Sequence, residues 1–139
     1  MINLTKLLYN ISSYGDELRY SRKLKSRARK PIVVWNMGRR CNLACIHCYS
    51  DSANKNYPGE LTTLEAEKMI RDLADFKVPV LLFSGGEPLL RKDLFQLNAL
   101  ARGLGLRTVI STNGTLINQQ TAQRIKSSGF DYVGVSLDG

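Results

Sequence analysis

The feature that most constrains the fold of this chain is a regular alternation of short apolar runs and amphipathic stretches after residue 30. The apolar runs occupy residues 32–35, 80–83, 108–110 and 132–135. Each run has the length of one strand, and runs that are apolar on both faces are typical of strands covered on both sides. Such strands, when helices separate them, form parallel sheets. We therefore predict an α/β fold with about four parallel strands.

Three longer stretches connect these runs and are predicted to be helices. The first begins at Thr62, which forms a capping-box pattern with Glu65 three residues later. The second begins at Asp93 and ends at Gly105, a residue type that favours helix ends. The third spans residues 118–128. The first two carry apolar side chains at helical spacing, so we expect them to cover the sheet.

Small polar motifs follow every predicted strand. The first strand runs into Asn36-Met37-Gly38, and the other three are followed by Ser-Gly-Gly-Glu-Pro at 84–88, Ser-Thr-Asn-Gly at 111–114 and Ser-Leu-Asp-Gly at 136–139. The carboxyl ends of parallel strands meet at one edge of a sheet, where α/β proteins bind ligands. Turn formation explains one such motif, because Gly, Ser and Asn are common turn residues, but it explains four in succession poorly. We predict a binding site at this edge.

All three cysteines of the chain lie just after the first predicted strand. Cys41, Cys45 and Cys48 form a C-x3-C-x2-C array. Thiols this close together, with no other cysteine in the chain, indicate a metal site rather than disulfides. Structural zinc takes four ligands, so three thiols favour a [4Fe–4S] cluster with one iron open to a non-protein ligand. The alternative is a zinc site with His47 as fourth ligand, although a residue directly beside Cys48 is poorly placed to close a tetrahedron.

Composition favours an intracellular protein. The chain has 139 residues and is 43% hydrophobic, which is enough for one domain with a buried core. No apolar run approaches the roughly 20 residues of a membrane-spanning helix, and residues 1–6 lack the layout of a signal peptide. We expect a cytoplasmic protein without a membrane span, in a reducing compartment that suits an oxygen-sensitive cluster.

The net charge of +8 is concentrated before the cysteines. Residues 1–40 carry ten Lys or Arg and two acidic residues, whereas residues 41–139 carry ten of each. The members of this basic block are chiefly Arg19, Arg22, Lys23, Lys25, Arg27, Arg29 and Lys30. Such a block attracts RNA, an acidic membrane surface or a substrate rich in carboxylates, unless it is only a solvated connector. Few aromatic residues lie within 21–34, so nucleic-acid binding by base stacking is not favoured.

The cysteine array, followed by Gly-Gly-Glu at 85–87, resembles the radical S-adenosylmethionine (SAM) superfamily. The 111–114 and 136–139 motifs extend this resemblance, which covers residues 31–139. It implies a partial (β/α)6 barrel, the N-terminal part of a longer enzyme, preceded by a basic extension at 1–30. In that family three cysteines hold a [4Fe–4S] cluster and SAM chelates the fourth iron. An electron from the cluster cleaves SAM to methionine and a 5′-deoxyadenosyl radical, which takes a hydrogen atom from the substrate.

The resemblance implies a role for each matching position. Cys41, Cys45 and Cys48 correspond to the cluster ligands, and His47 stands where the family often has an aromatic residue near the adenine. The positions that match contacts to the SAM carboxylate or ribose are Ser111, Asn113, Ser136 and Asp138, each of which could instead stabilise a turn.

The glycine motif carries a separate expectation. Gly85 and Gly86 would let the backbone approach the methionyl amino group of SAM, where a side chain would obstruct it. A bulky residue at Gly86 is therefore expected to block SAM while sparing the cluster. Glu87 resembles the acidic partner of that amino group, unless it only caps a helix.

Further runs resemble the tetrapyrrole-modifying members of the family. Residues 14–20, 34–36, 47–50 and 82–91 are similar to enzymes of haem d1 synthesis and of the route from sirohaem to haem, above all to the one that decarboxylates the acetate side chains of sirohaem. Sirohaem is a polycarboxylate and would suit the basic block. The resemblance also implies a reducing electron donor such as ferredoxin or flavodoxin. Two alternatives stand: a radical SAM maturase of a ribosomal peptide, and a non-catalytic zinc or iron–sulfur module that would not need the polar strand-end motifs.

Overall fold

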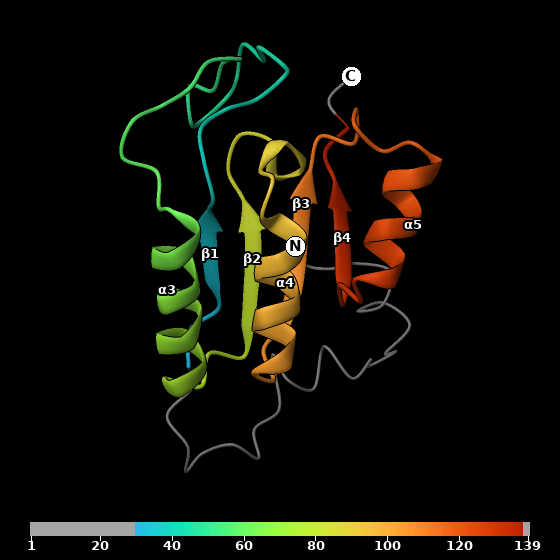
Figure 1. Ribbon diagram of the computed structural model, residues 1–139. Helices are drawn as coiled ribbons and strands as arrows, with labels where there is room; N and C mark the ends of the chain where they lie inside the picture. Colours follow the sequence, from blue (N-terminus) through green and yellow to red (C-terminus); the bar gives the residue numbers. More distant parts are fainter. Residues whose placement is uncertain (1–29, 138–139) are drawn as a thin grey trace, which may run out of the picture.

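Four parallel strands form one sheet in the computed structural model, which describes residues 30–137 (Figure 1). The strands are β1 (Val33–Asn36), β2 (Val80–Ser84), β3 (Arg107–Thr112) and β4 (Tyr132–Val135). Their spatial order is β1-β2-β3-β4, the same as their order in the chain. This order is that of a (β/α) barrel wall, whereas a doubly wound sheet reverses its order at a switch point. The predicted α/β fold with four parallel strands is confirmed.

Helices connect the strands, and Figure 1 shows α3 and α4 side by side over the same face of the sheet. Their bounds are α3 (Thr63–Asp75), α4 (Leu94–Gly103) and α5 (Gln119–Ser127), with a short 3-10 turn, η2 (Pro88–Leu90), after β2. The Arg124 guanidinium of α5 lies 4.1 Å from the centre of the Phe95 ring of α4, so α5 continues the same helical layer. No helix within residues 30–137 is long and apolar enough to cross a membrane.

The helices α3 and α4 begin next to the residues predicted to start them, but only one of the two starts is capped by a side chain. The capping box of α3 is complete, because Thr62 accepts from the Glu65 N–H and Glu65 accepts from the Thr62 N–H. Asp93 precedes α4 but makes no capping hydrogen bond. Its carboxylate instead accepts from Arg91 Nε at 2.7 Å and from the Thr63 hydroxyl at 2.8 Å. Asp93 therefore ties the start of α4 to the start of α3.

The core lies between the sheet and this helical layer. Trp35 of β1 and Phe83 of β2 point toward the helices, with ring centres 6.0 Å apart. The other residues buried there from strands and helices are Ala66, Ile70, Leu81, Leu94, Leu97, Ala101 and Ile110. Because side chains alternate along a strand, the residues between them face the opposite side of the sheet.

That opposite face carries two levels that differ in chemistry. Strand register places Val34, Leu82, Val109 and Tyr132 side by side as an apolar level. On each strand, the residue two positions closer to the carboxyl end belongs to a second level, which is polar. Its members are Asn36, Ser84, Ser111 and Gly134. The sheet thus becomes polar where its strands end, which is the edge at which the sequence predicts a site.

Candidate functional site at the carboxyl edge of the sheet

The cysteine loop, residues 38–53, rises above β1 at the edge to which the strand arrows point (Figure 1). Its first residues are joined to the segment after β2 by three backbone hydrogen bonds. Met37 N–H donates to Ser84 O at 2.9 Å. Gly86 N–H donates to Gly38 O at 2.8 Å, and Glu87 N–H donates to Arg40 O at 2.9 Å. The parallel pairing of β1 and β2 therefore continues past both strands and fixes the chain just before Cys41.

Gly85 and Gly86 are required by this pairing. Gly85 has φ of +129°, and a Cβ there would collide with the Gly38 carbonyl oxygen. A Cβ on Gly86 would collide with the Arg40 carbonyl oxygen and lie 2.6 Å from that of Arg39. A side chain at Gly86 would thus push against the backbone that leads to the first cysteine. The expectation that a bulky residue at Gly86 would spare the cluster does not fit this packing.

Glu87 is buried, with 3% of its surface exposed, and both of its carboxylate oxygens are engaged. Oε1 accepts from Leu89 N–H at 3.0 Å and from the Thr112 hydroxyl at 2.8 Å. Oε2 accepts from Asn113 N–H at 2.8 Å. The carboxylate thus caps η2, as the alternative interpretation held, and also joins the end of β2 to the end of β3. This second contact was not foreseen.

The three thiols have different surroundings. Cys41 is buried, Cys48 is half-buried and Cys45 is exposed. Cys41 Sγ accepts from Leu43 N–H at 3.4 Å and from the side-chain amide of Asn113 at 3.6 Å. The Ser50 hydroxyl and the backbone N–H of Ser52, both hydrogen-bonded to Cys48 Sγ, lower the pKa of that thiol to about 7. Thiolates are the forms that bind metals, so this loop favours ligation.

Arg39 holds the far side of the cysteine loop in place. Its guanidinium donates from Nε to Ser50 O at 3.0 Å and from Nη2 to Asp51 O at 2.9 Å. It also lies 4.4 Å from the centre of the Tyr57 ring. No local pattern distinguishes Arg39 from the other arginines, because each of these contacts depends on how the loop turns.

The donor set of the cysteine loop consists of three free thiols, the number that a three-thiolate cluster requires. Within residues 30–137, no three His, Cys, Asp or Glu side chains are gathered closely enough to hold a metal ion, so neither the three thiols alone nor the thiols with His47 form a preassembled site. The thiols share one loop, and Cys45 and Cys48 would close on the metal as it binds, as coupled metal sites do. Three thiolates leave one iron of a cubane cluster open.

Two further sequence-predicted residues, Ser111 and Ser136, lie at the carboxyl ends of β3 and β4. Ser111 is half-buried on the polar level of the sheet, and Ser136 is exposed just after β4, where its N–H donates to Thr112 O at 2.9 Å. Asp138 and the basic block up to Arg29 lie outside the described residues. Sequence reasoning missed Tyr49, whose hydroxyl donates to Asn36 Oδ1 at 3.1 Å and so links the cysteine loop to the polar level.

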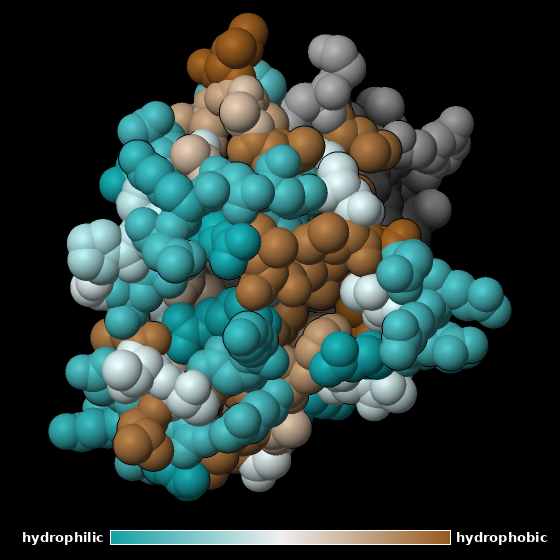
Figure 2. All heavy atoms as spheres, turned by 45° about the horizontal axis from the view of Figure 1, so that its top comes forward, coloured by the Kyte–Doolittle hydropathy of each residue, from teal (hydrophilic) through white to brown (hydrophobic). Residues whose placement is uncertain are grey.

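Apolar side chains are exposed around the same edge. In Figure 2, where this edge is turned forward, hydrophobic surface lies among hydrophilic side chains. The exposed large hydrophobic residues of the loop and of the β4 end are Ile46, Tyr49, Val135 and Leu137. Apolar surface beside a polar site is typical of ligand or partner binding.

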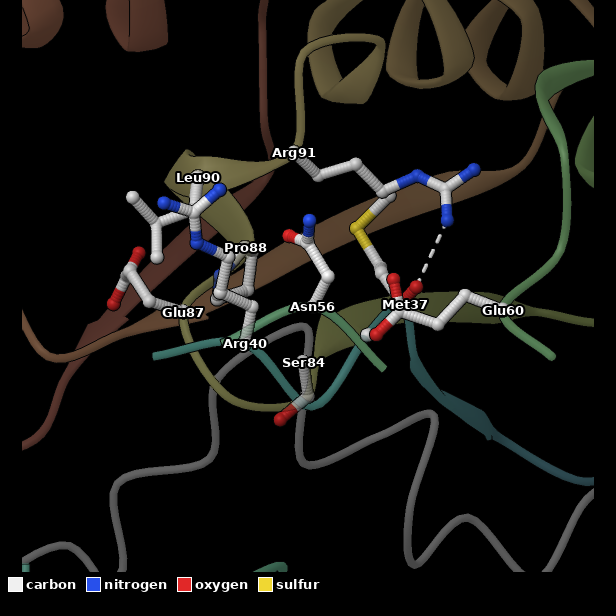
Figure 3. Close-up of a pocket in the computed structure, with 10 residues that line it drawn as sticks. Met37, Arg40, Asn56, Glu60, Ser84, Glu87, Pro88, Leu90 and Arg91 are labelled. Carbon is white, nitrogen blue, oxygen red and sulfur yellow. Dashed lines mark hydrogen bonds between the residues drawn. The ribbon is translucent and has the colours of Figure 1, made fainter. Parts of the chain in front are cut away.

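A pocket of about 160 Å³ lies beside the glycine motif and contains none of the cysteines (Figure 3). Its lining includes Glu60, Glu87 and Arg91. The Arg91 guanidinium donates to Met37 O at 2.8 Å and to Leu61 O at 2.9 Å. It also donates to the Asp93 carboxylate described above. The pocket is smaller than the roughly 300–1,000 Å³ of typical small-molecule sites, so we do not assign SAM to it.

Comparison with known proteins decides the family. The sequence profile described as the radical SAM superfamily matches residues 35–139. The chain belongs to the radical SAM superfamily. Members of this superfamily use a [4Fe–4S] cluster and SAM. The crystal structure of the radical SAM enzyme BtrN in complex with AdoMet (SAM) and 2-DOIA shares the fold, with a TM-score of 0.67 and 20% identity over 81% of this chain and 48% of that one.

Named relatives within the superfamily resemble the chain more closely. Fe-coproporphyrin III synthase of Methanosarcina barkeri is 51% identical over 100% of this chain and 37% of its own length. Pre-heme d1 synthase of Dinoroseobacter shibae is 47% identical over 95% of this chain and 33% of its own length. Mycofactocin maturase MftC of Mycobacterium ulcerans is 37% identical over 77% of this chain and 29% of its own length. The chain thus spans about a third of the length of these relatives.

Proposed function

We propose that this chain is part of a radical SAM enzyme of haem or haem d1 biosynthesis that decarboxylates acetate side chains of a sirohaem-derived tetrapyrrole. The observation that carries the proposal is the extent of the match to two relatives named for tetrapyrrole products, which includes the segment before residue 35 where the superfamily profile does not reach. The peptide maturase is less identical and matches a smaller share of the chain. The tetrapyrrole function is therefore favoured over peptide maturation.

Within this proposal Cys41, Cys45 and Cys48 hold the cluster. When bound, the cluster and SAM supply a 5′-deoxyadenosyl radical that removes a hydrogen atom from the substrate. The backbone of Gly85 and Gly86 would line the site of the methionyl amino group.

Other predicted residues would complete the cofactor site around the glycine motif. Glu87 supports the methionyl site by fixing the backbone around it, because both of its carboxylate oxygens accept hydrogen bonds within the protein. The side chains that would meet the adenine, ribose or carboxylate of SAM are His47, Ser111, Ser136 and Asp138. Asn113 is treated separately below, because its amide faces the first cysteine.

The proposed substrate also suits the N-terminal extension at 1–30. Tetrapyrroles with several carboxylates are polyanions, and the basic block would attract them by long-range electrostatics. A low-potential donor such as ferredoxin or flavodoxin would supply the electron, and the reducing cytoplasm would protect the cluster. Because the abstracted hydrogen atom ends in 5′-deoxyadenosine, each acetate that becomes a methyl group and CO2 would take up one further electron from this donor and one proton.

The test is an anaerobic assay of the full-length, cluster-loaded protein with SAM, a reductant and sirohaem. We expect sirohaem to lose CO2 from its acetate groups, detected by mass spectrometry, with formation of 5′-deoxyadenosine. Cys45→Ala is the matched control and should do neither. SAM cleavage that leaves sirohaem unchanged would argue against the substrate but not against the family.

A further inference from the structure

We propose that Asn113 is a positioning residue of the cluster, and that its side-chain N–H donates to the Cys41 sulfur and raises the reduction potential of the cluster. The inference rests on the proposed cluster site at Cys41. It starts from one contact, the 3.6 Å between Asn113 Nδ2 and Cys41 Sγ. Cys41 is the buried one of the three cysteines, so this hydrogen bond lies where water competes least.

The orientation of the Asn113 amide is determined by its neighbours. Oδ1 accepts from Thr115 N–H at 3.0 Å and from the Thr115 hydroxyl at 2.7 Å. Nδ2 donates a second hydrogen bond to Asn42 Oδ1 at 3.1 Å. A flipped amide would place its N–H2 group against the Thr115 N–H and its oxygen against Asn42 Oδ1, so the N–H2 group faces Cys41.

The backbone of Asn113 is fixed as well. Its N–H donates to the buried Glu87 carboxylate at 2.8 Å, and the same carboxylate binds the hydroxyl of Thr112. The glycine motif after β2 therefore holds the loop after β3 in the position from which its amide reaches the sulfur. Both polar atoms of the amide are engaged within the protein, which favours a role toward the cysteine over a direct contact to SAM.

The expected effect follows from charge. Adding one electron to the cluster increases the negative charge on its sulfur ligands, and an N–H donor stabilises that charge. Groups that hydrogen-bond to metal ligands tune the metal in this way. Removing the donor should make the cluster harder to reduce, so its midpoint potential should become more negative.

The experiment is a redox titration of the full-length, anaerobically reconstituted protein without SAM, followed by electron paramagnetic resonance (EPR) spectroscopy. Asn113→Ala should retain iron and titrate at a more negative potential than the wild type. Asn113→Asp, which replaces the donor with a carboxylate, should shift further in the same direction. Thr115→Val removes the hydroxyl bond to the amide oxygen and should give a smaller shift of the same sign. The matched control is Asn118→Ala, an asparagine that caps α5 through Thr121, which should titrate like the wild type.

Equal potentials for wild type, Asn113→Ala and Asn113→Asp at full iron content would overturn the inference. If both Asn113 variants lose iron, the Thr115→Val variant provides the test. A midpoint potential of Thr115→Val equal to that of the wild type would then reject the proposed role of Asn113. These failures leave the proposed function intact. By contrast, a wild type that takes up no iron would reject the cluster site itself.

Discussion

Replacing Cys41, Cys45 or Cys48 by Ala is expected to abolish iron uptake. Anaerobically reconstituted wild-type protein should hold about four iron and four sulfide per chain, as a cubane cluster requires. Each single variant should fall to near zero, because two thiolates do not retain a cluster that three hold. Iron and sulfide analysis, together with the visible absorption of the cluster, measures this directly.

His47→Ala is the control that separates the two metal sites considered for this loop. A cluster held by three cysteines should survive the change with its full iron content. A zinc site that used His47 as fourth ligand should instead lose its metal. Stoichiometric zinc with no iron in the wild type would reject the cluster assignment.

Gly86→Ala is expected to disturb both the fold and the cluster. The added Cβ meets the carbonyl oxygens of Arg39 and Arg40, and backbone atoms cannot rotate aside as a flexible side chain can. Overpacking of this kind costs about 1–3 kcal/mol, and here the strain falls on the residues that precede the first cysteine. We expect a lower free energy of unfolding in chemical denaturation and a reduced iron content after reconstitution.

Gly103→Ala provides the matched control for the glycine motif. Gly103 lies in the last turn of α4, and a Cβ there would have no neighbouring atom within 4 Å. Helix propensity favours Ala over Gly, so this variant should be as stable as the wild type or slightly more stable, with full iron content. A Gly86→Ala protein as stable and as iron-rich as Gly103→Ala would contradict the packing seen at this edge.

Much of the fold was predictable because its signals are local. The Thr62–Glu65 pair forms a capping box whatever the rest of the chain does, and the apolar runs mark the strands. Strand ends were harder to predict: β3 extends to Thr112, beyond its predicted run at 108–110, because backbone hydrogen bonds continue where the side chains turn polar. The position of the polar motifs at one edge of the sheet was predictable because the carboxyl ends of parallel strands lie at the same edge.

The contacts within the site were not predictable from sequence. Glu87 was interpreted as a SAM partner or a helix cap, but its carboxylate also binds the end of β3, which is distant in the chain. Arg39 carried no assignment from the sequence, yet its guanidinium donates to the carbonyls of Ser50 and Asp51. Such roles depend on tertiary approach, which no local pattern encodes.

The most direct test of the central claim is the EPR spectrum of the reduced, reconstituted full-length protein with and without SAM. If three cysteines hold the cluster and leave one iron open, the amino and carboxylate groups of SAM should bind that iron and change the spectrum. The account predicts a clear change that saturates with SAM concentration. A reduced cluster whose spectrum is identical with and without saturating SAM would contradict it.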